Sequence, residues 1–209
     1  MNNTPFLVDF SKIIVGAPIW EWARVVRDAG VPNAWIGAGA VRNLVWKRCF
    51  GDQCHVLTPD IDVAYWEADL SEGREQAWEG KLNKLLPAPW QARNQHRFSS
   101  KKTHQPWNSA EDGIASWVET ATTVAIRHGE HDELIVFVPY GLEDLFAGIL
   151  RPTDDVGDEV FLDRVKAKQW QEHCPALRVE LKRIPKKDQK IMIEMTSNII
   201  SREESRGFP

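Results

Sequence analysis

The amino-acid sequence predicts an α+β fold in which helices pack on a mixed β-sheet. Segments with helical and strand-like hydrophobic patterns follow one another without strict alternation. Residues 122–127 and 133–138 are apolar runs joined by a polar turn that contains Gly129, which is typical of an antiparallel hairpin. Residues 90–98 alternate between two faces. The hairpin and the alternating strand together favour a mixed sheet over a fully parallel one.

The composition is that of a globular protein and excludes several classes. Of the 209 residues, 43% are hydrophobic and 27% are charged, so the chain has enough apolar residues to form a core. The 26 Lys and Arg residues against 30 Asp and Glu residues give a net charge of −4, so we expect no binding of long nucleic acid. Residues 1–5 have no basic n-region, so we expect no secretory signal, and no apolar run approaches the roughly 18 residues of a membrane span. We therefore expect a cytoplasmic protein without a membrane partner.

The cysteine pattern predicts free thiols. Cys49, Cys54 and Cys174 are too few, and odd in number, for a disulfide framework, so we expect all three to be reduced. Cys49, Cys54 and His55 have a loose metal-ligand spacing, but a fourth ligand is missing. The sequence therefore predicts no zinc site here.

Local signals define the elements of the first half of the chain. A helix is predicted from Pro18 to Ala29, because proline suits a first turn, Gly30 suits a C-terminal cap, and apolar residues recur on one stripe. Ser71 is the expected N-cap of a later helix, which two prolines end. The predicted elements after the first helix are a strand at 34–36, a helix at 41–46, a polar loop at 51–59, a strand at 60–66 and a helix at 74–86.

The second half continues with the alternating strand at residues 90–98. One face of this strand carries Trp90, Ala92, Asn94, His96 and Phe98. A short helix is predicted at residues 109–117, because Ser109 or Asn108 suits its N-cap and acidic residues occupy its first turn. The hairpin follows. Helices are then predicted at residues 142–150 and 159–172, separated by a turn-rich stretch.

The segment from Ile36 to Trp66 carries the chemistry. A turn of sequence Gly37-Ala38-Gly39-Ala40 separates a strand from a helix, and glycines let the backbone approach a ligand closely. The free N–H groups and the dipole of a helix N-terminus attract an anion such as phosphate. Asp60 and Asp62 lie two positions apart on a strand, so their carboxylates share one face and repel each other unless a cation binds them. A phosphate-binding turn beside a carboxylate pair predicts Mg²⁺-dependent phosphoryl or nucleotidyl transfer.

These motifs are similar to those of a known superfamily. Ala38-Gly39-Ala40-Val41-Arg42-Asn43-Leu44, followed by Asp60-Ile61-Asp62-Val63, resembles the Gly-Gly-Ala-Val-Arg-Asp…Asp-Ile-Asp signature of DNA polymerase β-type nucleotidyltransferases, in the form found in tRNA CCA-adding enzymes. Over a longer span, the chain resembles a bacterial family of uncharacterised nucleotidyltransferase-like proteins. The resembling segments are residues 35–43, 60–65, 93–95, 117–121, 141–146 and 150–152.

The resemblance covers residues 15–178, which we expect to form a nucleotidyltransferase-like domain. Residues 179–209 are the expected C-terminal extension, whose run at 182–190 has five basic residues and one acidic residue. The resemblance implies a mixed β-sheet flanked by helices, divalent ions such as Mg²⁺, and a nucleoside triphosphate donor.

The resemblance also assigns roles to individual residues. Asp60 and Asp62 match the two metal-binding carboxylates. Gly39 matches the second glycine of the turn that faces the triphosphate, and Ala38 replaces the first. Arg42 and Asn43 stand where Arg-Asp follows in CCA-adding enzymes. We therefore expect Gly37, Gly39, Arg42 and Asn43 at the nucleotide.

Three departures from the superfamily pattern are evident. The 20 residues between Gly39 and Asp60 make a long gap, which the loop at 51–59 can absorb. The superfamily usually has a third carboxylate on a neighbouring strand, and the corresponding residue here is Asn94, which we expect near the nucleotide but not as a base. Glu119 is the substitute catalytic carboxylate that we consider, from the far side of the sheet. No tRNA-binding helical domain is found, so CCA addition itself is not implied.

The sequence leaves three functions open. The leading hypothesis is a Mg²⁺-dependent nucleotidyltransferase that moves a nucleoside monophosphate from a nucleoside triphosphate to a hydroxyl acceptor, which is a small molecule, a protein or an RNA end. The alternative is a catalytically degenerate nucleotide-binding or sensing module, because Asn94 cannot act as a base. A third hypothesis, an accessory protein that acts through its tryptophan-rich surface and basic tail, predicts no nucleotide affinity.

Overall fold

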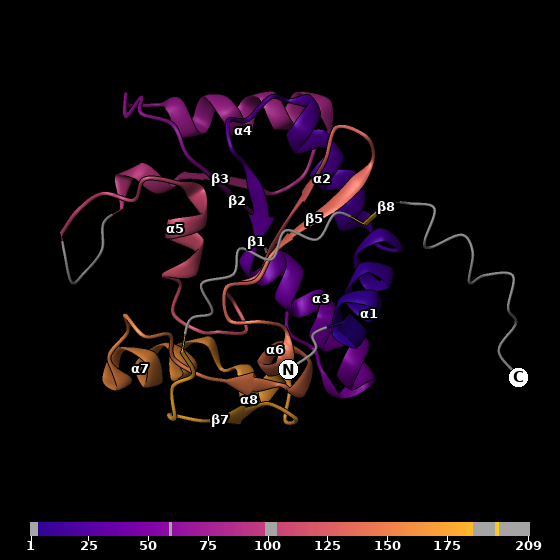
Figure 1. Ribbon diagram of the computed structural model, residues 1–209, viewed down its shortest axis with the longest axis vertical. Helices are drawn as coiled ribbons and strands as arrows, with labels where there is room; N and C mark the ends of the chain where they lie inside the picture. The colour runs from indigo at the N-terminus through magenta and orange to yellow at the C-terminus, as the bar shows by residue number, and fades with distance from the viewer. Residues whose placement is uncertain (1–3, 59, 99–103, 186–194, 197–209) are drawn as a thin grey trace, which may run out of the picture.

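The computed structural model describes residues 4–58, 60–98, 104–185 and 195–196, and it contains a six-stranded sheet (Figure 1). The strand order is β3-β2-β1-β4-β5-β8. Strands β2 and β3 are parallel and the other neighbouring pairs are antiparallel, so the predicted mixed sheet is confirmed. The strands are β1 (Trp35–Gly37), β2 (Ile61–Tyr65), β3 (Trp90–Asn94), β4 (Ala125–His128), β5 (Glu133–Phe137) and β8 (Met195–Thr196). A second, parallel pair consists of β6 (Ile149–Leu150) and β7 (Arg178–Val179).

Helices cover the two faces of the sheet unequally. On one face, Ile36, Val63 and Ile126 belong to the main core, which also includes apolar residues of α1 (Thr4–Val15), α2 (Pro18–Asp28), α3 (Ala38–Phe50) and α4 (Arg74–Leu85). On the other face, Trp35 and Phe137 pack in a smaller cluster against α5 (Ala110–Ala115). The short α5 leaves part of this second face uncovered, and the pocket described below lies there.

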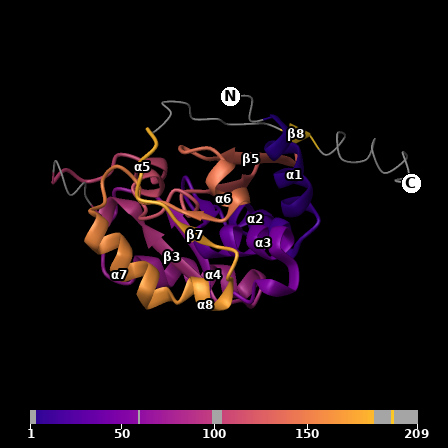
Figure 2. The same cartoon turned by 90° about the horizontal axis from the view of Figure 1, so that it is seen from below.

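The C-terminal helices lie at the end of the sheet where α3 begins. They are α6 (Glu143–Ala147), α7 (Asp158–Lys168) and α8 (Trp170–His173), and two short 3-10 helices are η1 (Gly51–Gln53) and η2 (Gln95–Arg97). Figures 1 and 2 both place α7 on the same side of the molecule as α5. Within the described residues, no helix is long and apolar enough to cross a membrane.

The free edge of β3 is covered by two glutamates of α4. Glu79 Oε1 accepts a hydrogen bond from the Ala92 amide at 3.0 Å, and Glu75 Oε1 accepts one from the Asn94 amide at 2.8 Å. These amides would otherwise be open to pairing with a strand of another chain. The two glutamates, one helical turn apart, therefore end the sheet on this side.

Several predicted boundaries differ from those observed. The strand predicted at 90–98 ends at Asn94, because the Asn94 side chain accepts a hydrogen bond from the His96 amide and caps η2. Helix α4 is capped by Gly73 and not by Ser71. The helix predicted at 159–172 is broken at Gln169, which has φ +50°. Helix α3 starts at Ala38, earlier than predicted, and helix α1 was not predicted at all.

The C-terminal extension is partly described. Arg183 of the basic run forms an ion pair with Asp158 at 2.7 Å and donates to the Val156 carbonyl. The predicted basic residues at 186–190 lie outside the described residues.

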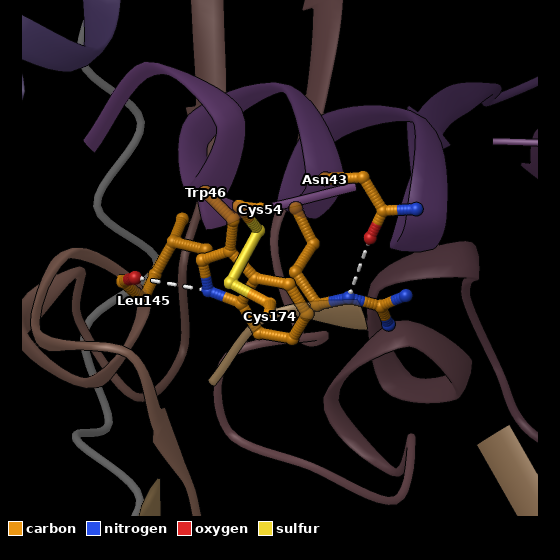
Figure 3. Close-up of a disulfide and its surroundings, with 6 residues drawn as sticks. Asn43, Trp46, Cys54, Leu145 and Cys174 are labelled. Atoms are coloured by element: carbon orange, nitrogen blue, oxygen red, sulfur yellow. Dashed lines mark hydrogen bonds between the residues drawn. A yellow bond between two sulfur atoms is a disulfide. The ribbon is translucent and has the colours of Figure 1, made fainter. Parts of the chain in front are cut away.

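The prediction of three free thiols was wrong for two of them. Cys54 and Cys174 form a disulfide, and only Cys49 is free. Figure 3 shows this disulfide beside α3, near the Trp46 indole, whose Nε1 donates to the Leu145 carbonyl at 3.2 Å. Both disulfide cysteines are buried. The inference of a reducing compartment from the cysteine count therefore no longer holds.

Candidate functional site

The two aspartates of the Asp-Ile-Asp motif stand at the start of β2. Ile61 and Val63 are buried in the main core, so Asp62, which alternates with them, lies on the opposite face of the sheet. A pocket of about 400 Å³ opens on this face, and Asp62 lines it. Asp60 precedes the strand by one residue and is two positions from Asp62, so the predicted side-by-side arrangement is compatible with the structure.

The electrostatic environment of Asp62 combines repulsion and attraction. Burial raises the pKa of Asp62 above its usual value, and the neighbouring Asp60 carboxylate raises it further. The positive charges of Arg42, Arg93 and Lys168 act in the opposite direction. A fourth cation, Arg164, lines the same pocket. A carboxylate pair is thus surrounded by basic side chains in a protein whose net charge is −4.

The turn before α3 places its residues differently from the sequence expectation. A Cβ atom on Gly37 would lie 2.8 Å from Trp117 Cη2 and 2.9 Å from the Val124 carbonyl, so this glycine permits close packing inside the protein. Ala38 lines the pocket and has φ +51°, a conformation that favours glycine. Ala38, which replaces the first glycine of the superfamily signature, is therefore the residue of the turn that adopts the left-handed conformation.

Helix α3 presents its N-terminus beside the pocket. Its N-cap, Gly37, has no side chain to bond the first N–H groups of the helix. Gly39 lies in the first turn, and the atoms nearest to a Cβ built on it are Asn43 Nδ2 at 3.7 Å and Arg42 Nη2 at 3.8 Å. Ala38 is the residue of this turn that lines the pocket, whereas Gly37, Gly39 and Arg42 do not, and Arg42 lies behind the pocket-lining Thr122. The N-terminus of α3, which would attract an anion, therefore meets the pocket at Ala38.

Arg42 is a buried cation held in a fixed position. Its guanidinium lies 4.9 Å from the ring centroid of Trp46 and 4.5 Å from that of Trp170. Its Nη1 donates to Thr122 Oγ1 at 2.7 Å. Burial lowers the pKa of Arg42 to about 10, and the Glu119 carboxylate acts against this shift, so the side chain stays charged at neutral pH.

Asn43 forms hydrogen bonds to the loop that precedes the aspartates. Its Nδ2 donates to the Leu57 carbonyl at 2.8 Å and to Thr58 Oγ1 at 3.2 Å. Its Oδ1 accepts a hydrogen bond from Arg42 Nε at 3.0 Å, which is drawn in Figure 3. Asn43 therefore connects the buried arginine to the loop immediately before Asp60, and it does not line the pocket.

Glu119 is fully buried and positions two arginines, Arg164 directly and Arg42 through Thr122. Its Oε1 accepts from Arg164 Nε at 2.7 Å. Its Oε2 accepts from Thr122 Oγ1 at 2.8 Å, and the same hydroxyl receives the Arg42 hydrogen bond. Glu119 does not line the pocket, whereas Thr122 and Arg164 do. The structure places Glu119 behind the pocket wall, as a countercharge for the arginines and not in the position of a base.

Asn94 lies on the other face of the sheet from Asp62. It is paired in register with Tyr65, which is buried in the main core. Its Nδ2 donates to the carbonyls of Glu67 and Asp69, at 2.9 and 3.2 Å. Asn94 therefore stabilises the segment after β2, and the structure does not bring it to the pocket.

The residues of β3 on the pocket side are Gln91 and Arg93. They are in register with Asp62 and Ala64 on the parallel strand β2. Arg93 lines the pocket, and Glu79 of α4 accepts a hydrogen bond from its Nη1 at 3.2 Å. The expected place of a third carboxylate is thus occupied by an amide and a guanidinium. Within the described part of the chain, no group of three or more His, Cys, Asp or Glu residues is arranged to hold a metal ion.

Sequence reasoning missed Arg164 and Lys168 as site residues. They lie four positions apart on α7, so they share one face of that helix. This spacing is visible in the sequence, but it does not indicate that α7 contributes to the same pocket as β2, about 100 residues earlier in the chain. The role of Arg93 was missed for a different reason, because the alternating pattern did not show which face of β3 carries the site.

The fold defines a class of protein: a mixed sheet flanked by helices, as in nucleotidyltransferase head domains. An NMR structure reported to reveal a CCA-adding enzyme head domain has a TM-score of 0.69 and 27% identity, and the match covers 83% of this chain and 95% of that one. A complex of a CCA-adding enzyme with ATP shares the fold at a TM-score of 0.50 and 16% identity, over 81% of this chain and 42% of that one.

A family model described as nucleotidyltransferase matches residues 24–179. This match spans more than half of the chain, and the protein belongs to this nucleotidyltransferase family. A comparison with curated proteins finds no match.

Proposed function

We propose that the protein is a Mg²⁺-dependent nucleotidyltransferase that transfers a nucleoside monophosphate from a nucleoside triphosphate to a hydroxyl acceptor. One observation carries the proposal: Asp62 lines the pocket at the N-terminus of α3, its pKa is raised by the neighbouring Asp60, and four basic side chains lie in or near the pocket. These basic side chains are Arg42, Arg93, Arg164 and Lys168. Anionic metal ligands and cationic phosphate ligands in one place are what a metal–triphosphate complex requires.

The donor atoms at the site fit a hard divalent cation. Asp60 and Asp62 offer carboxylate oxygens, the ligands that Mg²⁺ prefers, and their mutual repulsion is relieved by a bound cation. Asp60 and Asp62 are the residues that would hold Mg²⁺. When bound, it would neutralise charge on the phosphates of the donor.

The other side chains of the site would position the triphosphate. The N-terminus of α3 would attract the phosphates, Arg164 would contact them from the pocket wall, and Arg42 would act on them from behind Thr122. Glu119 and Thr122 keep both arginines in place through the hydrogen bonds described above. Arginines that are ordered in advance lose little conformational entropy when the substrate binds.

The proposed reaction forms a bond between the acceptor oxygen and the α-phosphorus, and breaks the bond from that phosphorus to the bridging oxygen of pyrophosphate. Because both oxygens of Glu119 are engaged, we do not assign it as the base. The proton of the acceptor hydroxyl would go to solvent, because Asp62, the carboxylate that lines the pocket, is assigned to the metal. The acceptor would approach over the face of β2 and β3, where the pocket continues past Asp62.

One observation favours a second candidate, a nucleotide-binding module without catalysis. The pocket side of β3 carries Gln91 and Arg93 where the superfamily usually has a third carboxylate. A binding module of this kind would bind the metal–nucleotide complex but release no pyrophosphate.

Calorimetric titration with ATP, CTP, GTP and UTP, with and without Mg²⁺, tests the proposal. We expect Mg²⁺-dependent binding in the wild type, a loss of at least tenfold in affinity in Asp60→Ala and Asp62→Ala, and unchanged binding in Asp52→Asn, an exposed acid of η1. A pyrophosphate assay with hydroxyl-bearing acceptor mixtures then separates the enzyme from the binding module. Equal binding by both alanine variants and the wild type would eliminate both candidates.

A further inference from the structure

The pocket extends well beyond the carboxylate pair. From Asp62 it follows the face of β2 through Ala64, and it reaches Gln95, Phe98 and Trp107. The Trp66 Nε1 donates to the Trp107 carbonyl at 2.7 Å. Trp66 is four residues beyond Asp62, which is about 13 Å along an extended chain. We call the far part of the pocket, defined by Gln95, Phe98 and Trp107, the aromatic end.

The aromatic end is held in position by backbone and ring contacts. The Trp107 amide donates a hydrogen bond to the Phe98 carbonyl at 3.2 Å, so the backbones of the two aromatic residues are directly linked. Trp66, which anchors Trp107, stacks on His96 with ring centroids 5.1 Å apart and an interplanar angle of 7°. Phe98 itself is 47% exposed, so part of its ring is accessible from the pocket. An ordered and partly exposed aromatic surface suits a flat ligand.

Gln95 gives this apolar surface a polar edge. The residue is buried, and its Nε2 donates to the Arg93 carbonyl at 3.1 Å. Its side chain lines the pocket. Gly113 of α5 makes room for it, because a Cβ atom there would lie 2.3 Å from Gln95 Oε1. An amide in the wall of a largely aromatic cavity offers a hydrogen-bonding group to a ligand.

We propose that the aromatic end binds a planar, nitrogen-containing ring, which stacks on Phe98 and Trp107 and donates a hydrogen bond to Gln95. The inference rests on the proposed function, which places the triphosphate at the carboxylate end of the same pocket. The ring has two possible sources, the base of the donor nucleotide and a ring carried by the acceptor. Stacking on aromatic side chains accepts any base, so the subsite would show little preference among purines.

The test uses three probes: adenosine, Mg²⁺ with inorganic tripolyphosphate, and Mg²⁺ with ATP. We expect adenosine to bind the wild type and to bind Phe98→Ala and Trp107→Leu about tenfold or more weakly. Tripolyphosphate should bind all three proteins equally. Leu85→Ala, which truncates an exposed leucine at the end of α4, is the matched control and should change neither affinity. Circular dichroism spectra and melting temperatures confirm that the variants are folded.

The ATP measurement identifies the source of the ring. If Phe98→Ala weakens ATP binding by the same factor as adenosine binding, the subsite holds the donor base. If ATP binding is unchanged and adenosine still binds the ATP-saturated protein, the subsite holds the acceptor ring. Adenosine that fails to bind the wild type, or binds both variants as tightly as the wild type, would overturn the inference. Failure of the proposed function would appear separately, as absence of Mg²⁺–tripolyphosphate binding.

Discussion

Reduction of the Cys54–Cys174 disulfide should destabilise the protein strongly. The two cysteines are separated by 120 residues, so the bond closes a long loop in the unfolded chain. The chain-entropy relation for a loop of this size gives about 5 kcal/mol of stabilisation. A domain of 150–250 residues changes its Tm by roughly 2–4 °C for each kcal/mol, so we expect a fall in Tm of about 10–20 °C.

Thermal unfolding followed by circular dichroism measures this effect. The double variant Cys54→Ala, Cys174→Ala should melt like the reduced wild type, and addition of dithiothreitol should not lower its Tm further. Cys49→Ala is the matched control, because Cys49 is exposed and outside the disulfide. It should retain the Tm of the oxidised wild type. A wild type whose Tm is insensitive to reductant, with all three thiols titratable in the folded state, would refute the assignment of this bond.

Three further predictions concern the site. Glu119→Gln should cost about 1–3 kcal/mol in urea unfolding, because Arg42 and Arg164 lose a buried countercharge, and a cost near zero would contradict its anchoring role. Without divalent cations, Asp62→Asn should raise the free energy of unfolding at pH 7 by roughly 0.5–2 kcal/mol. Since burial raises the pKa of Asp62, the wild type loses stability as the pH rises through that folded-state pKa. The stability gained by the variant should therefore vanish below the unfolded-state pKa. A gain that does not depend on pH would argue against this cause. Gly37→Ala should destabilise the folded protein by about 1–3 kcal/mol, because the added Cβ atom clashes with Trp117. Ala38→Gly should stabilise it by up to about 1 kcal/mol, because glycine adopts the left-handed conformation of this position without strain. Thermal melts that show the reverse order would refute this description of the turn.

Much of the fold follows from local sequence patterns. The hairpin of β4 and β5 was predicted from two apolar runs and a glycine-containing turn, and it is confirmed because that signal is short-range. Helix α1 was missed although its buried Leu7, Phe10 and Ile14 recur every three or four residues, a spacing typical of a helix.

The candidate site was predictable only where its geometry is local. Asp62 is placed on the pocket face by the alternation of β2, which needs no knowledge of the rest of the fold, whereas Asp60 precedes the strand by one residue. For Asn94, alternation along β3 gave Trp90 and Ala92 correctly as residues of the same face, but His96 and Phe98 lie beyond the end of the strand, and the pattern did not show which face the pocket uses. Asn94, which has a structural role, and Arg93, which lines the pocket, are adjacent in the sequence but lie on opposite faces of β3.

Contacts between distant parts of the chain were not accessible from the sequence. Arg164 reaches Glu119 across 45 positions, and Cys54 pairs with Cys174 across 120. The number of cysteines did not indicate their pairing, since pairing depends on how α8 packs against the loop after α3. The close approach of Trp117 to Gly37 likewise depends on tertiary packing, and a Gly-x-Gly pattern alone suggested a phosphate contact.

The central claim is that Asp60 and Asp62 bind a divalent cation together with a nucleoside triphosphate. Titration of the protein with Mn²⁺, with free Mn²⁺ measured by electron paramagnetic resonance in the presence and absence of ATP, tests it most directly. The structure predicts ATP-dependent Mn²⁺ binding by the wild type and by Asp52→Asn, and its loss in Asp60→Ala and Asp62→Ala. Mn²⁺ and ATP that bind both alanine variants as tightly as they bind the wild type would contradict it.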